Sequence, residues 1–212
     1  DLPELCAGKY AAGLELGKWV KASMLTSRSS TASSSLDFYS DSARFLGTFE
    51  PGLERIIVDH FGNNYKGVEL DYVIERMPLG TGGGLLLATE KVGKSDPFLL
   101  LNGDTYFEKD IFAKASEIAK QGLDAITLFG HLTNEYYDDD MLINVMDGKM
   151  LNVGKNLKKA NGVSSGAIFM SSGGLKKYLD IINLGSTKNL KTHHGILQFI
   201  CDSGFDVDFL GT

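Results

Sequence analysis

One stretch in the middle of the chain limits the available folds more than any other. It joins a glycine-rich segment at 80–84 to a helix-forming apolar run at 85–92 and then to an apolar strand at 98–101 that ends in Asn102-Gly103-Asp104. Glycines let a backbone approach a ligand closely, and a helix that follows them adds its positive end. A carboxylate after a buried strand lies where ligands bind in open α/β sheets. The stretch predicts a nucleotide at the glycines and a divalent cation at Asp104.

Strands and helices alternate on both sides of this stretch. Residues 68–74 alternate apolar and polar side chains, as a half-buried strand does. Residues 110–121 carry the apolar face of a helix, and a further strand is expected at 125–132. The alternation predicts an α/β fold, specifically a three-layer Rossmann-like domain around a central, mostly parallel mixed sheet.

The second half of the chain is richer in hairpins. The Asp147-Gly148 pair predicts a turn between two strands. The other expected elements are the hairpin strands within 141–153, a strand at 165–170, helices at 174–182 and 190–201, and a strand at 207–210. No repeat or boundary is visible, so we expect residues 1–212 to form one domain. Its nucleotide-binding half is 1–135, and 136–212 binds the second substrate.

The first sixty residues are harder to interpret. A short strand is expected at 5–7 and helices at 36–45 and 54–61. Between positions 23 and 35, nine of thirteen residues are Ser or Thr. Such residues bury little apolar area, so 22–35 is expected to be a linker or a disordered loop.

Composition excludes several functional classes. A net charge of −6 argues against a nucleic-acid partner, because binding a polyanion needs clustered Lys and Arg. No apolar run is long enough to cross a membrane and no signal peptide is visible, so the cytoplasm is the expected location. Cys6 and Cys201 have neither metal nor redox spacing and are expected to be reduced.

The central motif resembles a known family. P-L-G-T-G-G, then a helix, then F-L-L-L-N-G-D-T-Y-F, is similar to the nucleotidyltransferases that make nucleotide sugars, above all the guanylyltransferases for mannose 1-phosphate or D-glycero-D-manno-heptose 1-phosphate. The resemblance implies Mg²⁺-dependent attack of a sugar 1-phosphate on a nucleoside triphosphate, with release of pyrophosphate. It assigns Asp104 to catalysis and to the metal, and it assigns the nucleotide to Gly80, Thr81, Gly82, Gly83, Asn102 and Gly103.

The second half matches the family less closely. Lys158-Lys159 stands where the family has Glu-Lys, and Ser164-Ser165-Gly166 stands where it has Asn-Gly-Gly. The resemblance therefore assigns Lys159 to catalysis, and Ser164 and Gly166 to the sugar phosphate. Residues 138–155 are instead similar to cytidylyltransferases for phosphocholine or inositol phosphate. The base, the acceptor and the oligomeric state stay open.

Two further family motifs are incomplete. The run 208–212 is similar to a strand with the family's second metal-binding Asp, which makes Asp208 a candidate unless that motif lies beyond Thr212. In the family's N-terminal triphosphate loop, Ala7 and Gly8 match, but Gly13 stands at the arginine position. Either the protein binds nucleotide sugars without catalysis, or the sequence from about 7 to 51 differs from that of the gene.

His193-His194 lies within the expected helix at 190–201. Adjacent residues cannot face the same side of a helix, which argues against a dinuclear metal site. Surface or helix-cap positions are therefore expected for both histidines.

Overall fold

A computed structural model describes residues 23–28, 43–49, 58–59, 61–65, 68–74, 80–92, 97–102, 110–121, 124–184 and 192–212. Its strands are β1 (Ser23–Arg28), β2 (Ala43–Phe49), β3 (Asn64–Tyr65), β4 (Val68–Ile74), β5 (Phe98–Asn102), β6 (Ile126–Leu132), β7 (Leu142–Met146), β8 (Lys149–Gly154), β9 (Gly162–Met170) and β10 (Asp208–Gly211). Its helices are α4 (Gly80–Val92), α5 (Asp110–Lys120), α6 (Ser172–Leu184) and α7 (His193–Asp202).

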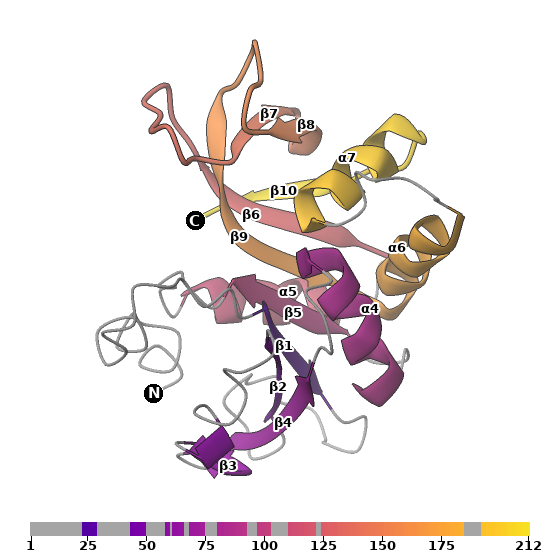
Figure 1. The fold of residues 1–212 in the computed structure, drawn as a ribbon. Coiled ribbons are helices and arrows are strands. Elements are labelled where there is room, and N and C mark those ends of the chain that lie inside the picture. Colours follow the sequence, from indigo (N-terminus) through magenta and orange to yellow (C-terminus); the bar gives the residue numbers. More distant parts are fainter. Residues whose placement is uncertain are drawn as a thin grey trace.

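The strands form one ten-stranded sheet in the order β3-β4-β2-β1-β5-β9-β6-β10-β8-β7. Strands from both halves of the sequence therefore share the sheet, and β5 and β9 meet near its centre (Figure 1). The expected strand at 68–74 and the helix at 110–121 are found almost as predicted, because each has a clear apolar period.

Strand β5 shows how the layers arise. Its side chains alternate between faces, so Phe98 and Leu100 pack into a core beneath α4, α6 and α7, whereas Leu99 and Leu101 pack against α5 on the other face. All four side chains are buried. The predicted mixed α/β class with a central sheet is confirmed, with helices on both faces (Figure 1).

The sheet has less parallel pairing than predicted. Among the described strands, β2 pairs in parallel with β4 and β10 with β6, while every other pairing is antiparallel. Two inner strands account for much of this difference. Strand β9 runs antiparallel to β5 and β6, and β1 runs antiparallel to β2 and β5. Strands that reverse direction inside the sheet cannot be inferred from the alternation of helices and strands.

Two expectations for the first half were wrong. Residues 23–28 of the Ser/Thr-rich run are strand β1, paired on both sides by β2 and β5. Residues 43–45, expected to end a helix, begin strand β2 instead. Pairing with neighbouring strands decides both cases and overrides the weak local preference. The expected strand at 5–7 lies outside the described residues.

The Asp147-Gly148 turn is confirmed, with φ of 51° and 72° at its two residues. Both values lie in the left-handed region that a two-residue hairpin turn of this kind requires. The strands that it joins, β7 and β8, begin and end close to the predicted limits. In the part of the chain that the structure describes, no helix has the length and hydropathy to span a bilayer.

Candidate active site

The predicted glycine loop is the first turn of a helix. We expected a loop at 80–84 and a helix from 85, but α4 begins at Gly80, whose φ is 74°. Gly82 and Gly84 are buried, so close packing offsets their poor helix propensity. A helical first turn is still compatible with the predicted nucleotide binding, because the first N–H groups of a helix have no partner within the helix.

Thr81 connects this turn to the second half of the chain. Its Oγ1 accepts a hydrogen bond of 2.9 Å from the backbone N–H of His193, the first residue of α7. Helix α7 is capped by Thr192, whose side chain accepts a hydrogen bond from the N–H of Gly195. The first turns of α4 and α7 therefore meet at one point.

The next residue, His194, reaches the strand predicted to bind the sugar phosphate. Its Nε2 lies 3.0 Å from Oγ of Ser164 on β9. The same Oγ accepts a hydrogen bond of 3.1 Å from the N–H of Gly166. The dipeptide His193-His194 thus joins Thr81, a predicted nucleotide residue, to Ser164 and Gly166, the predicted acceptor residues.

A β-bulge shapes β9 at this position. The register between β6 and β9 shifts between Leu128 and Gly130, and Gly166 in the bulge has φ of 77°. Ser165 Oγ donates a hydrogen bond of 2.9 Å to the carbonyl of Phe129 and so holds the bulge against β6. A Cβ at Gly130 would come within 2.3 Å of the Val163 carbonyl oxygen, which explains the glycine. Bulges of this kind often redirect a side chain beside a ligand site.

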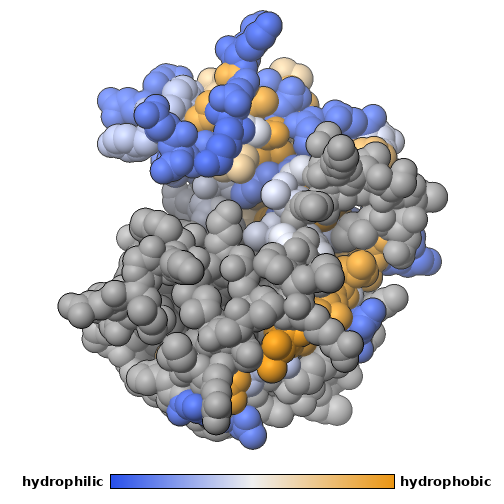
Figure 2. All heavy atoms as spheres, in the orientation of Figure 1, coloured by the Kyte–Doolittle hydropathy of each residue, from blue (hydrophilic) through white to orange (hydrophobic). Residues whose placement is uncertain are grey.

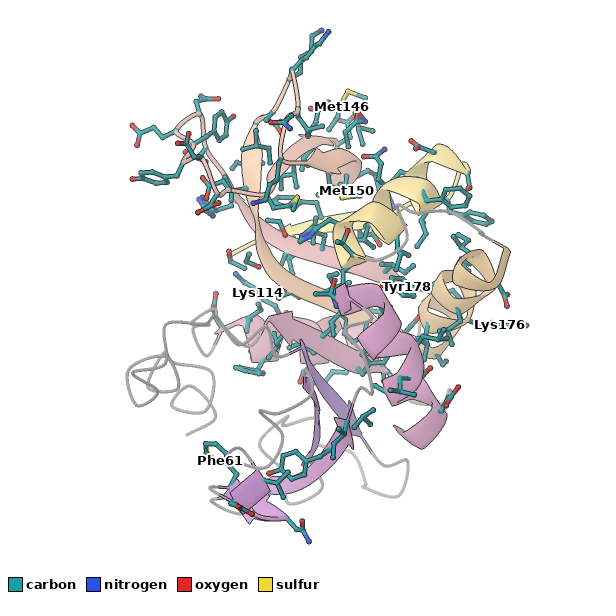
Figure 3. All side chains as sticks on the ribbon, viewed as in Figure 1. Phe61, Lys114, Met146, Met150, Lys176 and Tyr178 are labelled. Carbon is teal, nitrogen blue, oxygen red and sulfur yellow. The ribbon has the colours of Figure 1, made fainter. Side chains whose placement is uncertain are left out.

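His193 is buried, which contradicts the expected surface position. Its exposed fraction is 3%, and Nδ1 lies 3.0 Å from the hydroxyl of Tyr178, the residue labelled between α6 and α7 in Figure 3. Its Nε2 is the buried side-chain atom without a hydrogen-bond partner in the described structure. Burial, with a smaller contribution from His194, lowers the pKa of His193 to about 3. Burial also lowers the pKa of His194 to about 4, so both rings are neutral at pH 7.

Lys159 is exposed in the loop between β8 and β9, five residues before Ser164. This loop is joined to residues 133–141 by hydrogen bonds from the Tyr136 hydroxyl to the Ala160 carbonyl and from the Thr133 N–H to the Asn161 carbonyl. Hydrophilic residues predominate along the outer edge of the upper part of the molecule in Figure 2, with hydrophobic residues visible between them. The catalytic role of Lys159 stays a prediction.

Asp208 has a different partner from the predicted metal. Its carboxylate is paired with the ammonium group of Lys149, which also lies 3.3 Å from Asp206. Asp208 is the first residue of β10, and its role as a metal ligand stays a prediction. Among the described residues, no three His, Cys, Asp or Glu side chains form a group that could hold a metal ion.

Several predicted residues cannot be placed. Ala7, Gly8, Gly103 and Asp104 lie outside the described residues. The backbone of Asn102 ends β5 one residue beyond the pair between Leu101 and Ala167, which puts it beside Gly166 of the bulge. Strand β5 therefore ends beside the bulge of β9, where Ser164 contacts α7.

Comparison with known proteins links these motifs to one class of enzyme. No protein-family model matches the chain. A 56-residue segment is 41% identical to D-glycero-alpha-D-manno-heptose 1-phosphate guanylyltransferase of Aneurinibacillus thermoaerophilus and 39% identical to the enzyme of that name from Campylobacter jejuni. The segment covers 26% of this chain and 24% of each relative, so the match spans about a quarter of the curated relatives' length.

Solved structures extend the likeness over most of the chain. The inositol-1-phosphate CTP transferase of T. maritima aligns with a TM-score of 0.63 at 19% identity, over 87% of this chain and 79% of that one. This is a nucleotidyltransferase fold. A putative glucose-1-phosphate thymidylyltransferase of Bacillus anthracis follows at 0.62 and 16% identity, over 74% and 63% of the two chains. HddC from Yersinia pseudotuberculosis aligns at 0.55 and 22% identity, over 80% and 68%.

The comparisons bear on the family resemblance that the sequence suggested. The resemblance stated from the sequence is confirmed by the curated relatives over a 56-residue segment and by the solved structures for the fold. The sequence did not predict the contact between α7 and β9 through His194, because surface or helix-cap positions were expected for both histidines. The Ser-for-Asn departure at Ser164 was the one sequence signal near it.

Proposed function

We propose that this chain transfers a nucleotidyl group from a nucleoside triphosphate to a sugar 1-phosphate. A phosphate oxygen of the sugar forms a bond to the α-phosphorus, and the bond between the α-phosphorus and the pyrophosphate oxygen breaks. The products are a nucleoside-diphosphate sugar and pyrophosphate. The substrates are present in the cytoplasm, which is the location we propose.

The observation that carries this proposal is the junction at His193-His194. It holds Thr81, from the motif shared with the guanylyltransferases, within a short chain of hydrogen bonds from Ser164 and Gly166. Transfer between two bound substrates depends mainly on holding them side by side. A junction between the predicted nucleotide residues and the predicted acceptor residues supplies such an arrangement.

A substrate panel tests the proposal. Each of the four nucleoside triphosphates is incubated with mannose, glucose and D-glycero-D-manno-heptose 1-phosphates, inositol 1-phosphate and phosphocholine, and released pyrophosphate is measured. We expect release with one triphosphate and one of the sugar 1-phosphates. Absence of acceptor-dependent release from every combination would overturn the proposed activity.

Mg²⁺ is part of the proposal, with Asp104 as the residue that would hold it. A divalent ion supplies charge neutralisation at the phosphates. We expect Asp104→Asn to lower turnover by roughly 100-fold or more while the circular dichroism spectrum is unchanged. Asp208 is the other predicted ligand and is paired with Lys149 here, so Asp208→Asn measures whether it contributes as well. Full turnover in Asp104→Asn would contradict the assignment of Asp104.

A cytidylyltransferase is the second candidate. The favouring observation is the structural alignment with the inositol-1-phosphate CTP transferase of T. maritima, at a TM-score of 0.63. The same panel separates the two, since this candidate predicts release with CTP and with inositol 1-phosphate or phosphocholine.

A non-catalytic nucleotide-sugar-binding protein is the third candidate, motivated by Gly13 at the arginine position. This third candidate predicts that calorimetry detects nucleotide binding and that no pyrophosphate is released.

A further inference from the structure

Ser164 and His194 form a polar pair at the surface of the bulge. Both residues are partly exposed, and Oγ of Ser164 lies 3.0 Å from Nε2 of His194. Their positions are thirty residues apart in sequence, on β9 and on the first turn of α7. The pair is therefore built by the fold and is reachable by a ligand.

Among the described residues, the Ser164 hydroxyl has partners for two of its three hydrogen-bonding positions. A hydroxyl offers one donor and two acceptor positions. The N–H of Gly166 occupies one acceptor position, and His194 occupies either the donor or the second acceptor position according to its tautomer. In both cases a single position stays open beside the bulge, and His194 decides whether it donates or accepts.

The chemistry of the pair fits a hydroxyl group better than a phosphate. His194 is neutral at pH 7 because burial lowers its pKa to about 4. Ser164 is also uncharged, so the pair offers no cation to a phosphate. A sugar hydroxyl can donate or accept, and it therefore matches the open position with either tautomer.

We propose that His194 is a positioning residue that orients the Ser164 hydroxyl toward a hydroxyl group of the acceptor sugar. This inference rests on the proposed function. It adds that the Ser-for-Asn departure at position 164 is compensated by a side chain from another element. His194 acts through Ser164 and does not touch the reacting phosphates.

The test is a double-mutant cycle read by the acceptor KM. His194→Ala and Ser164→Ala should each raise the acceptor KM by about 10-fold, the effect of one lost hydrogen bond, with the KM for the triphosphate unchanged. The acceptor KM of the double variant should be no higher than the higher of the two single-variant values, because both substitutions remove the same interaction. His194→Gln, which keeps a polar group at similar reach, should restore part of the affinity. Ser203→Ala, at the exposed opposite end of α7, is the matched control.

Each outcome decides the inference. Additive losses in the double variant, or an unchanged acceptor KM in both single variants, overturn it. An equal rise in both substrate KM values indicates a general disturbance and also overturns it. If His194→Ala does not fold, the comparison of Ser164→Ala with Ser164→Thr, which keeps the hydroxyl, decides in its place. A wild-type protein that releases no pyrophosphate fails the proposed function instead, and calorimetric binding of the sugar phosphate to the same variants then tests the pair alone.

Discussion

His193 combines deep burial with an unsatisfied ring nitrogen. Only 3% of the residue is exposed, and its Nε2 has no partner in the described structure. A protonated imidazole at this place would put an unpaired charge into the core beside Tyr178. The same residue supplies the N–H that holds Thr81, so its protonation state bears on the geometry of the site.

We expect His193 to make the protein less stable in acid. Its pKa is lowered to about 3 in the folded state, against about 6.5 in an unfolded chain. Between these values only the unfolded state binds the proton, so the free energy of unfolding decreases as the pH falls from 7 toward 3. Between pH 7.5 and 4.5 the expected loss from His193 is about 3 kcal/mol.

Urea denaturation at the two pH values measures this effect. Between pH 7.5 and 4.5 the free energy of unfolding should fall by about 3 kcal/mol more in the wild type than in His193→Gln. The other acid-sensitive groups are common to both proteins and cancel in the comparison. His131→Gln, at an exposed position of β6, should behave as wild type. Equal losses in wild type and His193→Gln would contradict the prediction.

At the scale of single elements, the attachment of β7 depends on one side chain. Asn161, just before β9, accepts a hydrogen bond from the N–H of Val145 at 2.8 Å and donates one to its carbonyl at 2.7 Å. The register of β7 against β8 shifts at this residue. The amide thus replaces a missing strand partner, and it anchors β7 to the start of β9, the strand that carries Ser164.

Removal of this amide should destabilise the protein. Asn161→Ala leaves both backbone groups of the buried Val145 without a partner, at an expected cost of about 1–3 kcal/mol in the free energy of unfolding. Asn152→Ala is the matched control, because the exposed Asn152 side chain bonds to the adjacent Leu151 carbonyl, and its change should stay within about 0.5 kcal/mol. Chemical denaturation measures both, and similar values for the two variants would refute the role of Asn161.

At the scale of the whole molecule, one core joins the two halves of the sequence. Val73 and Leu85 from the first half belong to the same buried cluster as Ile143, Leu197 and Val207 from the second. The sheet is also continuous from β3 to β7 (Figure 1). Neither half can lose its packing without exposing apolar surface of the other.

We therefore expect the chain to unfold in a single cooperative transition. Calorimetry should give equal calorimetric and van't Hoff enthalpies, and circular dichroism should report the same midpoint. This outcome would support the prediction of a single domain with two substrate-binding halves. Two resolved transitions, or different midpoints by the two methods, would show that the halves unfold separately.

The sequence by itself determined the elements whose signal is local. Strand β4 and helix α5 follow from their apolar periods, and the turn between β7 and β8 follows from Asp147-Gly148. The predicted nucleotide motif also lies within one short segment, which is why its resemblance to the guanylyltransferases could be seen directly. In each case the residues that matter are neighbours along the chain.

Only the tertiary structure decided the remaining features. Strand β1 exists because β2 and β5 pair with it on both sides, although its residues favour no strand. The first turn of α4 is helical because Gly82 and Gly84 are packed, and Ser164 meets His194 across thirty residues. These outcomes depend on contacts between segments that are distant in sequence. Such contacts leave no periodic or compositional trace in either segment, so the fold alone could show that the predicted nucleotide residue Thr81 and the predicted acceptor residue Ser164 are joined through α7.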